Sequence, residues 1–548
     1  MEICVIRGKQ KNPFNLYNLW QKKINKMKNL KINNRFTAEL PADPDLTNEI
    51  RQVKNTLFSY VNPTKPSNPK LIHASEEVAE LVGISKDEIQ SEEFLNVFSG
   101  KDILPETKPF AMCYAGHQFG NWAGQLGDGR AINLTEVENN NQFYTLQLKG
   151  AGKTPYSRTA DGLAVLRSSI REYLCAEAMY NLGVPTTRSL SLILSGDQVL
   201  RDILYNGNPA YEKGAVVCRV APSFIRFGSY EMLTARNELK NLKQFVEFTI
   251  KHYFHEITGE PKEQYLQFFQ KVADTTREMI LHWQRVGFVH GVMNTDNMSI
   301  HGITIDYGPY GWLENYDPDW TPNTTDSQNR RYRFGNQPQV AQWNLFQLAN
   351  ALYPLINEAA PLEKILDTFI TDFESDYKTM FLSKLGIFTS SEADDKIIKG
   401  LEEILQLSET DMTIFFRNLS KIKKDDSVEQ AFEKIEYAFY IPEEIRENIL
   451  DAWQKWFTVY LKRLSTEELS DNERSEKMNE INPKYVLRNY MAQLAIDAAD
   501  KEDYSLVDEL FQLLKNPYDE QPESEKWFAK RPDWARTKVG CSMLSCSS

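Results

Sequence analysis

Residues 288–308 read FVHGVMNTDNMSIHGITIDYG, and this stretch decides which fold the sequence predicts. Asp296 and Asn297 follow the end of an apolar strand, a short hairpin with a His-Gly turn comes next, and Asp306 follows a second apolar strand. Oxygen ligands from one Asn and one Asp suit Mg²⁺, which binds few protein groups and completes its shell with phosphate oxygens. We therefore expect Asn297 and Asp306 to be metal ligands. A purely structural hairpin with surface turns is the alternative.

The order of these residues imitates a protein kinase, whose catalytic loop ends in Asn and is followed by Asp-Phe-Gly. Here Asp306 begins Asp-Tyr-Gly. In the kinase pattern the catalytic base lies five residues before the Asn, and that position is Val292, which can take no proton. The nearby carboxylate is Asp296, directly beside Asn297. A different base position indicates a different placement of the reacting phosphate.

A lysine and a glutamate upstream of this segment also match a pattern of protein kinases. Lys149 ends an apolar strand predicted over 143–149, and Glu172 lies in a helix predicted over 163–182, on a face of small and apolar residues. An unpaired carboxylate on such a face would be costly. A strand lysine paired with a helix glutamate holds nucleotide phosphates in kinases. An ordinary surface lysine and an unrelated helix glutamate are the alternative.

Two further patterns suit phosphate binding, although each could also be purely structural. Residues 116–130 are dense in glycine and end in Gly127-Asp128-Gly129-Arg130, so backbone amides can approach phosphates closely. A plain turn-rich loop is the alternative for this run. Arg219 and Arg226 stand in apolar company, where guanidinium forks suit phosphate oxygens. Structural salt bridges are the alternative for this pair.

The coarse pattern is β-rich first and then mostly helical. Further strands are predicted over 189–194 and 215–220, and helical periodicity dominates 237–286 and 340–548. We predict an α+β fold of the two-lobed protein-kinase type, with a β-rich N-lobe, a helical C-lobe, and N-terminal and helical C-terminal extensions. The expected segments are a dispensable extension over 1–26, a helical and loop extension over 27–105, the N-lobe over 106–218, the C-lobe with the active site over 219–400, and a helical region with a Cys-containing tail over 401–548.

Composition excludes several classes of protein. The 548 residues carry a formal net charge of −13, which argues against general nucleic-acid binding. No apolar run approaches the ~18 residues of a membrane span, so no membrane association is expected. Six cysteines in so long a chain do not make a disulfide scaffold. The Lys- and Asn-rich start lacks the features of a secretory signal or a mitochondrial transit peptide.

Taken together, the motifs resemble selenoprotein O and its bacterial homologues, a pseudokinase-like family of protein adenylyltransferases. The resemblance runs from about Met27 to the C-terminus. It rests on GHQFGNWAGQLGDGRA at 116–131, LQLKGAGKTPYSR at 146–158, SSIREYLCAEAM at 168–179, CRVAPSFIRFG at 218–228, HGVMNTDNMSI at 290–300 and IDYGPYGW at 305–312.

The resemblance implies that ATP lies flipped relative to a kinase, so that AMP moves to a Ser, Thr or Tyr hydroxyl and pyrophosphate leaves. It implies Asp296 as catalytic base, Asn297 and Asp306 as ligands of Mg²⁺ or Mn²⁺, and Lys149 paired with Glu172. The implied nucleotide contacts are Gly127, Gly129, Arg130, Lys149, Asp161, Gly162, Arg219, Arg226 and Asp306. Animal members carry a selenocysteine third from the end, a place that Cys546 takes here. Cys541 and Cys546 could form a redox-sensitive pair, or be tail cysteines without a role.

Two other functions remain open at this point. One is a conventional kinase-like phosphotransferase, and the other is a non-catalytic nucleotide-binding scaffold, because Val292 replaces the usual base. UTP could also serve as donor, since the motifs hold phosphates rather than an identified base. The expected partners are ATP and proteins with hydroxyl acceptors, including the chain itself, with no nucleic acid and no membrane. A cytoplasmic bacterial protein is expected, or a mitochondrial one if the source is eukaryotic.

Overall fold

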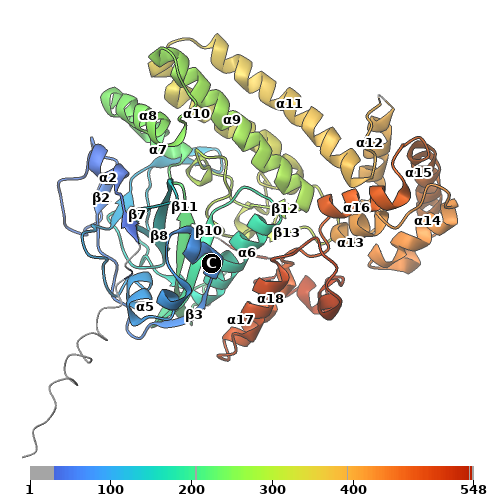
Figure 1. Cartoon of the computed structure of the whole chain (residues 1–548), viewed down its shortest axis with the longest axis horizontal. Helices are drawn as coiled ribbons and strands as arrows, with labels where there is room; N and C mark the ends of the chain where they lie inside the picture. Colours follow the sequence, from blue (N-terminus) through green and yellow to red (C-terminus); the bar gives the residue numbers. More distant parts are fainter. Residues whose placement is uncertain (1–26, 28–29, 204–205, 392, 542, 546–548) are drawn as a thin grey trace, which may run out of the picture.

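The computed structural model describes residues 27, 30–203, 206–391, 393–541 and 543–545. The extension expected over 1–26 and the terminal Cys546 lie outside the described residues. The described chain is a mixed α/β protein with a large antiparallel sheet and many helices (Figure 1). None of its described helices combines the length and the apolar character that a membrane span needs.

The main sheet has nine strands, and all pairings between them are antiparallel. Its central path runs in the order β2-β4-β7-β8-β11-β10-β3, while β1 pairs with β7 and β9 pairs with β11. The strands are β1 (Lys31–Ile32), β2 (Phe58–Tyr60), β3 (Lys70–Ala74), β4 (Phe110–Met112), β7 (Ala131–Asn139), β8 (Gln142–Lys149), β9 (Ala164–Val165), β10 (Arg188–Arg201) and β11 (Ala210–Ala221).

The central strands place two of the predicted site residues on one face. The strand predicted over 143–149 is confirmed as β8, and it is joined to β7 by Asn140 and Asn141, whose positive φ angles of 51° and 60° suit a tight hairpin. In the register of β8 with β11, Lys149 lies opposite Val217 and Gln147 lies opposite Arg219. Side chains alternate along a strand, so Lys149 and Arg219 point to the same side of the sheet.

Helix α6 (Leu166–Asn181) packs against β10 and β11 and carries Glu172. The prediction began this helix at residue 163, three residues too early. Ala164 and Val165 form the short strand β9 against β11 instead, because the β-branched Val165 extends the sheet before the chain turns into the helix. Gly183 follows the helix with a φ of 72°, as expected of a glycine after a helix end.

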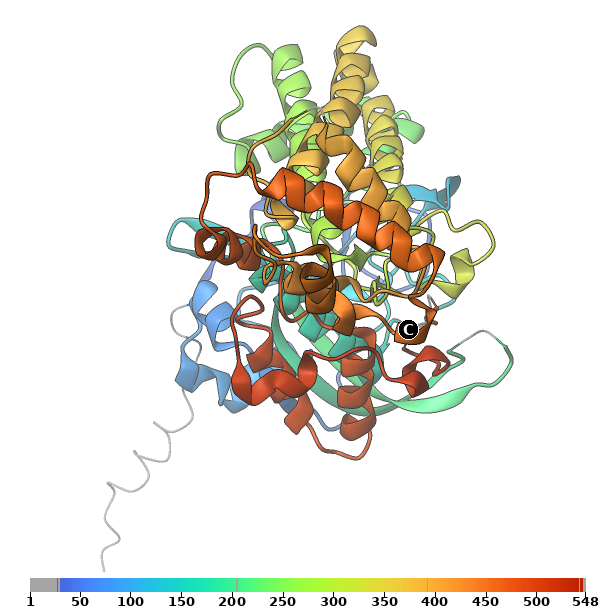
Figure 2. The same cartoon turned by 90° about the vertical axis from the view of Figure 1, so that its right-hand side faces the viewer.

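The second half of the chain is helical, as predicted. The helical pattern over 237–286 contains two helices, because Pro261 starts α9 after a turn that contains Gly259 at a φ of 114°. In Figures 1 and 2 the long helices α9, α10 and α11 gather at the top of the molecule. The helices of this half up to α11 are α7 (Phe227–Ala235), α8 (Leu239–Tyr253), α9 (Pro261–Val286), α10 (Gln337–Ile356) and α11 (Ala360–Lys384).

Two hydrophobic clusters hold these elements together. One joins the sheet to α6–α11, α17 and α18, and the other joins the end of α11 to α12–α16. Helices α17 and α18 return to pack against α6, at the opposite end of the molecule from α9 and α11 (Figures 1 and 2). The helices that complete the chain are α12 (Asp394–Ile404), α13 (Met412–Leu419), α14 (Val428–Ile435), α15 (Asn448–Leu464), α16 (Asp471–Ile481), α17 (Asn489–Ala499) and α18 (Ser505–Leu513).

The segment 288–308 differs from its prediction in one respect. The turn at His301-Gly302 forms, but its two arms are bonded to other segments rather than paired with each other. Ser299 bridges to Arg226, and Thr304 bridges to Thr186. The predicted hairpin is therefore wrong, because the apolar arms are buried against neighbouring segments that the local sequence does not reveal.

One consequence of this burial is testable through His301. Its ring packs against Tyr253 and Phe254, and burial lowers its pKa from about 6.5 to about 4. The unfolded chain therefore binds a proton below pH 6.5 that the folded chain refuses until about pH 4, so stability falls as the pH drops through this window. Between pH 7 and pH 5 the loss from this residue is about 2 kcal/mol.

We expect His301→Gln to remove that part of the pH dependence, because glutamine has no proton to take up. Urea unfolding at pH 7 and pH 5 measures it. The matched control is His255→Gln, at a surface histidine, which should leave the difference between the two pH values unchanged. An equal pH dependence in wild type and His301→Gln would contradict the prediction.

Candidate active site

A cavity of about 640 Å³ lies between the glycine-rich loop, the face of the sheet that carries Lys149, and residues 292–309. It gathers most of the site residues that the sequence predicted. The predicted residues on its wall are Gly127, Gly129, Arg130, Lys149, Arg219, Arg226, Asp296, Asn297 and Asp306.

The predicted lysine–glutamate pair is formed, and an arginine joins it. Glu172 on α6 receives Lys149 Nζ on one carboxylate oxygen and Arg219 Nε on the other, with all three side chains buried. Burial alone would raise the pKa of Glu172, but Arg219 and Lys149 hold it below its usual value. Burial, opposed by Glu172 and helped by Arg219 and Arg130, lowers the pKa of Lys149 to about 8.

Because two cations share one carboxylate, the three residues are not equivalent for stability. Glu172→Gln leaves Lys149 and Arg219 buried beside each other, and we expect a loss of about 3–5 kcal/mol of unfolding free energy. Lys149→Met should cost clearly less, since Glu172 keeps Arg219. Urea denaturation of both variants measures the difference, and equal losses would contradict this view of the cluster.

Asp306 is held by two arginines. Its Oδ1 accepts a hydrogen bond from Arg219 Nη1 at 2.9 Å, and its Oδ2 pairs with Arg226 Nη1. Burial alone would raise the pKa of Asp306, but Arg226 and Arg219 hold it well below its usual range. The residue has a φ of 59°, a left-handed conformation that aspartate tolerates better than most residues and that aims the carboxylate at the arginines. The sequence analysis expected these arginines to bind phosphates and gave structural salt bridges as the alternative. The structure shows salt bridges of both arginines, with Asp306 as the shared partner that the sequence did not indicate.

Asp296 lies in a short 3₁₀ turn, Thr295–Asn297, and is almost fully buried. Its Oδ2 accepts a hydrogen bond from Gln118 Nε2 at 3.2 Å, while Oδ1 has no hydrogen-bond partner among the described residues. Burial, only partly offset by Gln118 and Arg226, raises the pKa of Asp296 to about 7. A carboxylate with a free oxygen and a pKa near 7 has the properties of a general base.

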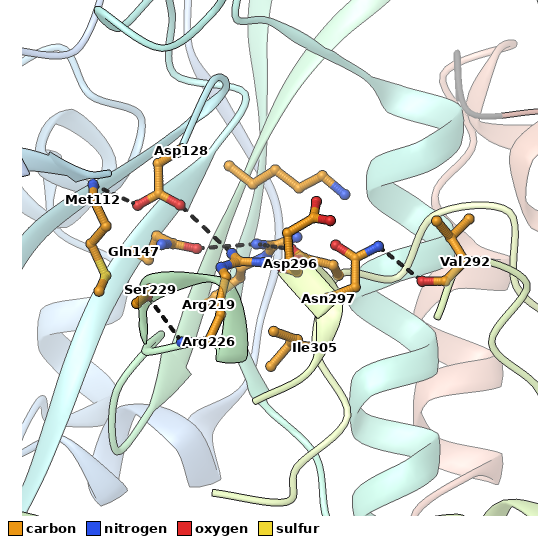
Figure 3. Close-up of polar contacts among 12 residues, drawn as sticks. Met112, Asp128, Gln147, Arg219, Arg226, Ser229, Val292, Asp296, Asn297 and Ile305 are labelled. Atoms are coloured by element: carbon orange, nitrogen blue, oxygen red, sulfur yellow. Dashed lines mark hydrogen bonds and ion pairs between the residues drawn. The ribbon is translucent and has the colours of Figure 1, made fainter. Parts of the chain in front are cut away.

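Asn297 is oriented by Val292, the residue that stands where kinases have their base. Its Nδ2 donates to the Val292 carbonyl at 2.9 Å, and no residue that the structure describes donates a hydrogen bond to its amide oxygen (Figure 3). In the same view Arg219 and Arg226 lie on one side of Asp296, and Asn297 lies on the other.

The donor set fits a hard divalent cation held mainly by a nucleotide. No group of three or more His, Cys, Asp or Glu side chains suited to a metal occurs in the described part of the chain. One amide oxygen from Asn297 and one carboxylate oxygen from Asp306 match Mg²⁺ or Mn²⁺ only when phosphate oxygens supply most other ligands.

The sequence prediction missed Asp128, which lies between the two glycines that it named. The side chain is buried, and its Oδ2 accepts from the Met112 amide at 3.0 Å and from Asn133 Nδ2 at 3.2 Å. Its Oδ1 lies 3.6 Å from Arg226 Nη2 and makes no hydrogen bond in the described structure (Figure 3). The signal in the sequence was a charged residue within a Gly-x-Gly-Arg turn. Gln118, which contacts Asp296, sits in the quoted motif but was also missed.

Two predicted nucleotide contacts do not lie on the cavity wall. Asp161 is bound to Arg201, at 2.7 and 2.8 Å. Gly162, with a φ of 74°, packs so tightly that an added Cβ would come 2.2 Å from the Gly152 backbone. Their neighbours Arg158 and Ala160 do line the cavity, so this loop borders the site through other residues.

The structure describes only one of the two cysteines in the predicted redox pair. Cys541 is buried, and burial raises its pKa to about 12, so little thiolate is present at neutral pH. Cys546 lies outside the described residues, and a redox pair therefore stays a prediction.

Comparisons with known proteins agree with the resemblance seen in the motifs. A family model described as "Protein adenylyltransferase SelO" matches residues 43–515. A protein nucleotidyltransferase YdiU of Flavobacterium johnsoniae is 85% identical over 522 residues, which cover 95% of this chain and 100% of the relative. Relatives with the same name from Rhodopirellula baltica and Aromatoleum aromaticum are 54% and 52% identical, each over 95% of this chain and 99% and 100% of their own length.

Proposed function

The chain belongs to the SelO family of protein adenylyltransferases, and from this premise we propose that it transfers AMP from ATP to Ser, Thr or Tyr hydroxyls of proteins, with release of pyrophosphate. The observation that carries the proposal is the single cavity that unites an anchored lysine, two arginines, Asp306 and Asn297 with a carboxylate whose pKa is raised to about 7. ATP and hydroxyl-bearing proteins, including the chain itself, are the proposed partners. The bacterial relatives favour action in a bacterial cytoplasm.

The proposed architecture is a two-lobed, kinase-like fold. The sheet and α6 would form the first lobe, and α7–α11 the second. The cavity draws residues from β8 and β11 on one side and from 292–309 on the other, which supports a nucleotide site between two lobes. The segment boundaries expected from the sequence remain proposals within this scheme.

The proposed mechanism rests on positioning and charge neutralisation. Lys149, held by Glu172, and the guanidinium groups of Arg219 and Arg226 would bind the phosphates of an ATP turned so that its α-phosphorus faces the acceptor. Asp296 would take the proton of the acceptor hydroxyl as that oxygen bonds to the α-phosphorus. The bond to the pyrophosphate oxygen then breaks, and pyrophosphate leaves with its electron pair. Asn297 and Asp306 would hold a divalent ion, which neutralises phosphate charge when bound.

The experiment that tests the proposal compares ATP labelled on the α-phosphate with ATP labelled on the γ-phosphate, in the presence of Mg²⁺ or Mn²⁺. We expect label to reach protein from the α position only, and intact mass to rise by one AMP per event. Transfer from the γ position would instead support a phosphotransferase. If ATP binds but neither label is transferred, the protein is a nucleotide-binding scaffold. The same assay with UTP measures donor preference.

A further inference from the structure

An exposed aromatic surface lies beside the cavity, next to Gln118 on the hairpin of β5 (Ala115–Gln118) and β6 (Asn121–Gln125). We call His117, Trp122, Trp343 and Phe346 the aromatic shelf. The His117 ring centroid lies 5.1 Å from that of Trp122 and 5.4 Å from that of Trp343. Phe346 follows Trp343 by three residues on α10, which puts both on one face of that helix. Trp122 is 44% exposed and Phe346 is 49% exposed, far more than rings in a closed core.

A cation borders this shelf. The Arg331 guanidinium carbon lies 4.6 Å from the Trp343 ring centroid, and its Nε is buried with no hydrogen-bond partner among the described residues. The described residues give Arg331 no ion pair, whereas Arg333, two positions on, pairs with Asp319 at 2.9 Å. Tyr332 is a side-chain partner of this guanidinium, and Asp326 interacts with its charge without forming an ion pair with it. An arginine stacked on an aromatic ring without an ion pair is a binding group for a carboxylate.

The aromatic shelf and Arg331 both lie next to residues that contact Asp296, the proposed base, or its loop. His117 precedes Gln118, whose Nε2 donates to Asp296 Oδ2 at 3.2 Å. Arg331 precedes Tyr332, whose hydroxyl donates to Asn294 Oδ1 at 2.6 Å, two residues before Asp296. A hydroxyl presented to the free oxygen of Asp296 therefore has this surface beside it, while Lys149 and the arginines of the cavity serve the nucleotide.

We propose that the aromatic shelf and Arg331 bind an extended segment of the acceptor protein, in which the modified hydroxyl residue is flanked by an aromatic residue and by Asp or Glu. The aromatic side chain packs on Trp122 and Trp343, and the carboxylate pairs with Arg331. This inference rests on the proposed function, because it assigns the acceptor of that reaction. Charge complementarity selects the occupant, since no carboxylate of the described chain forms an ion pair with the guanidinium, and Asp326 interacts with its charge only from a greater distance.

Short synthetic peptides with one central threonine test the inference. One carries Asp and Phe around the threonine, a second carries Lys and Phe, and a third carries Asp and Ala. AMP incorporation from α-labelled ATP gives kcat/KM for each. We expect the Asp–Phe peptide to be modified about tenfold more efficiently than either other peptide. Arg331→Glu should reverse the order of the Asp–Phe and Lys–Phe peptides, and Trp122→Ser should abolish the preference for Phe over Ala.

Matched controls separate contact from general charge or surface effects. Arg330→Glu makes the same charge change at the exposed neighbouring residue, and Tyr211→Ser removes an aromatic ring that is 72% exposed on β11. Both should keep the wild-type order of peptides. ATP binding should be unchanged in all four variants, because none of the four residues lines the cavity.

The outcomes distinguish this inference from the proposed function. If all three peptides are modified equally, and Arg331→Glu leaves that unchanged, the inference is overturned while adenylyl transfer stands. If no peptide is labelled, the inference is overturned, and the α- and γ-label assay on whole proteins still judges the function. If Trp122→Ser changes the molecular mass in light scattering instead of the peptide preference, the shelf joins two copies of the chain and the inference is overturned.

Discussion

Replacing Asp306 by alanine is expected to abolish metal-dependent nucleotide binding and to lower the rate of AMP transfer by roughly 10³-fold, which corresponds to about 4 kcal/mol of barrier. The reason is twofold. The proposed divalent ion loses its carboxylate ligand, because Asn297 offers a neutral amide oxygen. Arg219 and Arg226 also lose the carboxylate that now orients both of them.

The same contacts make a second result expected for this variant. In the absence of metal, Asp306→Ala should bind ATP as well as wild type or better, since Arg219 and Arg226 are then free to bind phosphates. Calorimetric titration of ATP with and without Mn²⁺ measures both quantities. Asp508→Ala is the matched control, because that carboxylate is exposed on α18 and pairs with His73 at the surface. Tight metal-dependent binding of ATP by Asp306→Ala would show that Asp306 is not a ligand of the metal.

The parts of the site that could be predicted are those encoded by local pattern. Period-two alternation over 143–149 located β8 and put Lys149 at its end, and the apolar face around Glu172 indicated a buried partner. The pair then formed as expected. Asp296, Asn297 and Asp306 were found from residue type and spacing, because carboxylates and an amide gathered between apolar strands are typical of a metal or catalytic site.

The parts that could not be predicted depend on contacts between distant segments. The clamp of Arg219 and Arg226 on Asp306 joins residues 80 or more positions apart, and nothing near Asp306 in sequence indicates it. The wrong hairpin at His301-Gly302 has the same origin, since its arms bond to residues 186 and 226. Asp128 was missed because a charged residue in a glycine turn is ordinarily exposed, whereas here the strands bury it.

Replacing Asp296 by asparagine is expected to lower transfer by about 10²–10⁴-fold while leaving ATP and metal binding nearly unchanged. Asparagine has the shape of aspartate and can keep the contact with Gln118, but it cannot accept the hydroxyl proton. Single-turnover measurement of AMP transfer at saturating ATP isolates this effect, and calorimetry of ATP binding supplies the control. Gln118→Leu is the companion variant. It removes the donor to Asp296 Oδ2 but keeps the carboxylate, so its loss of rate should be much smaller.

The unfolding free energy of the Asp296→Asn variant distinguishes a catalytic role of Asp296 from a structural one. A buried carboxylate with one oxygen unpaired is costly to fold, and burial has raised the pKa of Asp296 to about 7 from an ordinary value of 3.8. Above pH 7 the folded, metal-free chain therefore carries the ionised carboxylate at a free-energy cost that the unfolded chain does not have. Asp296→Asn removes this cost and should raise the unfolding free energy of the protein by about 1 kcal/mol or more. A structural carboxylate would behave in the opposite way, because its removal would break contacts and destabilise the chain. Lower stability with undiminished transfer in Asp296→Asn would therefore identify Asp296 as part of the scaffold, and another group would have to take the proton.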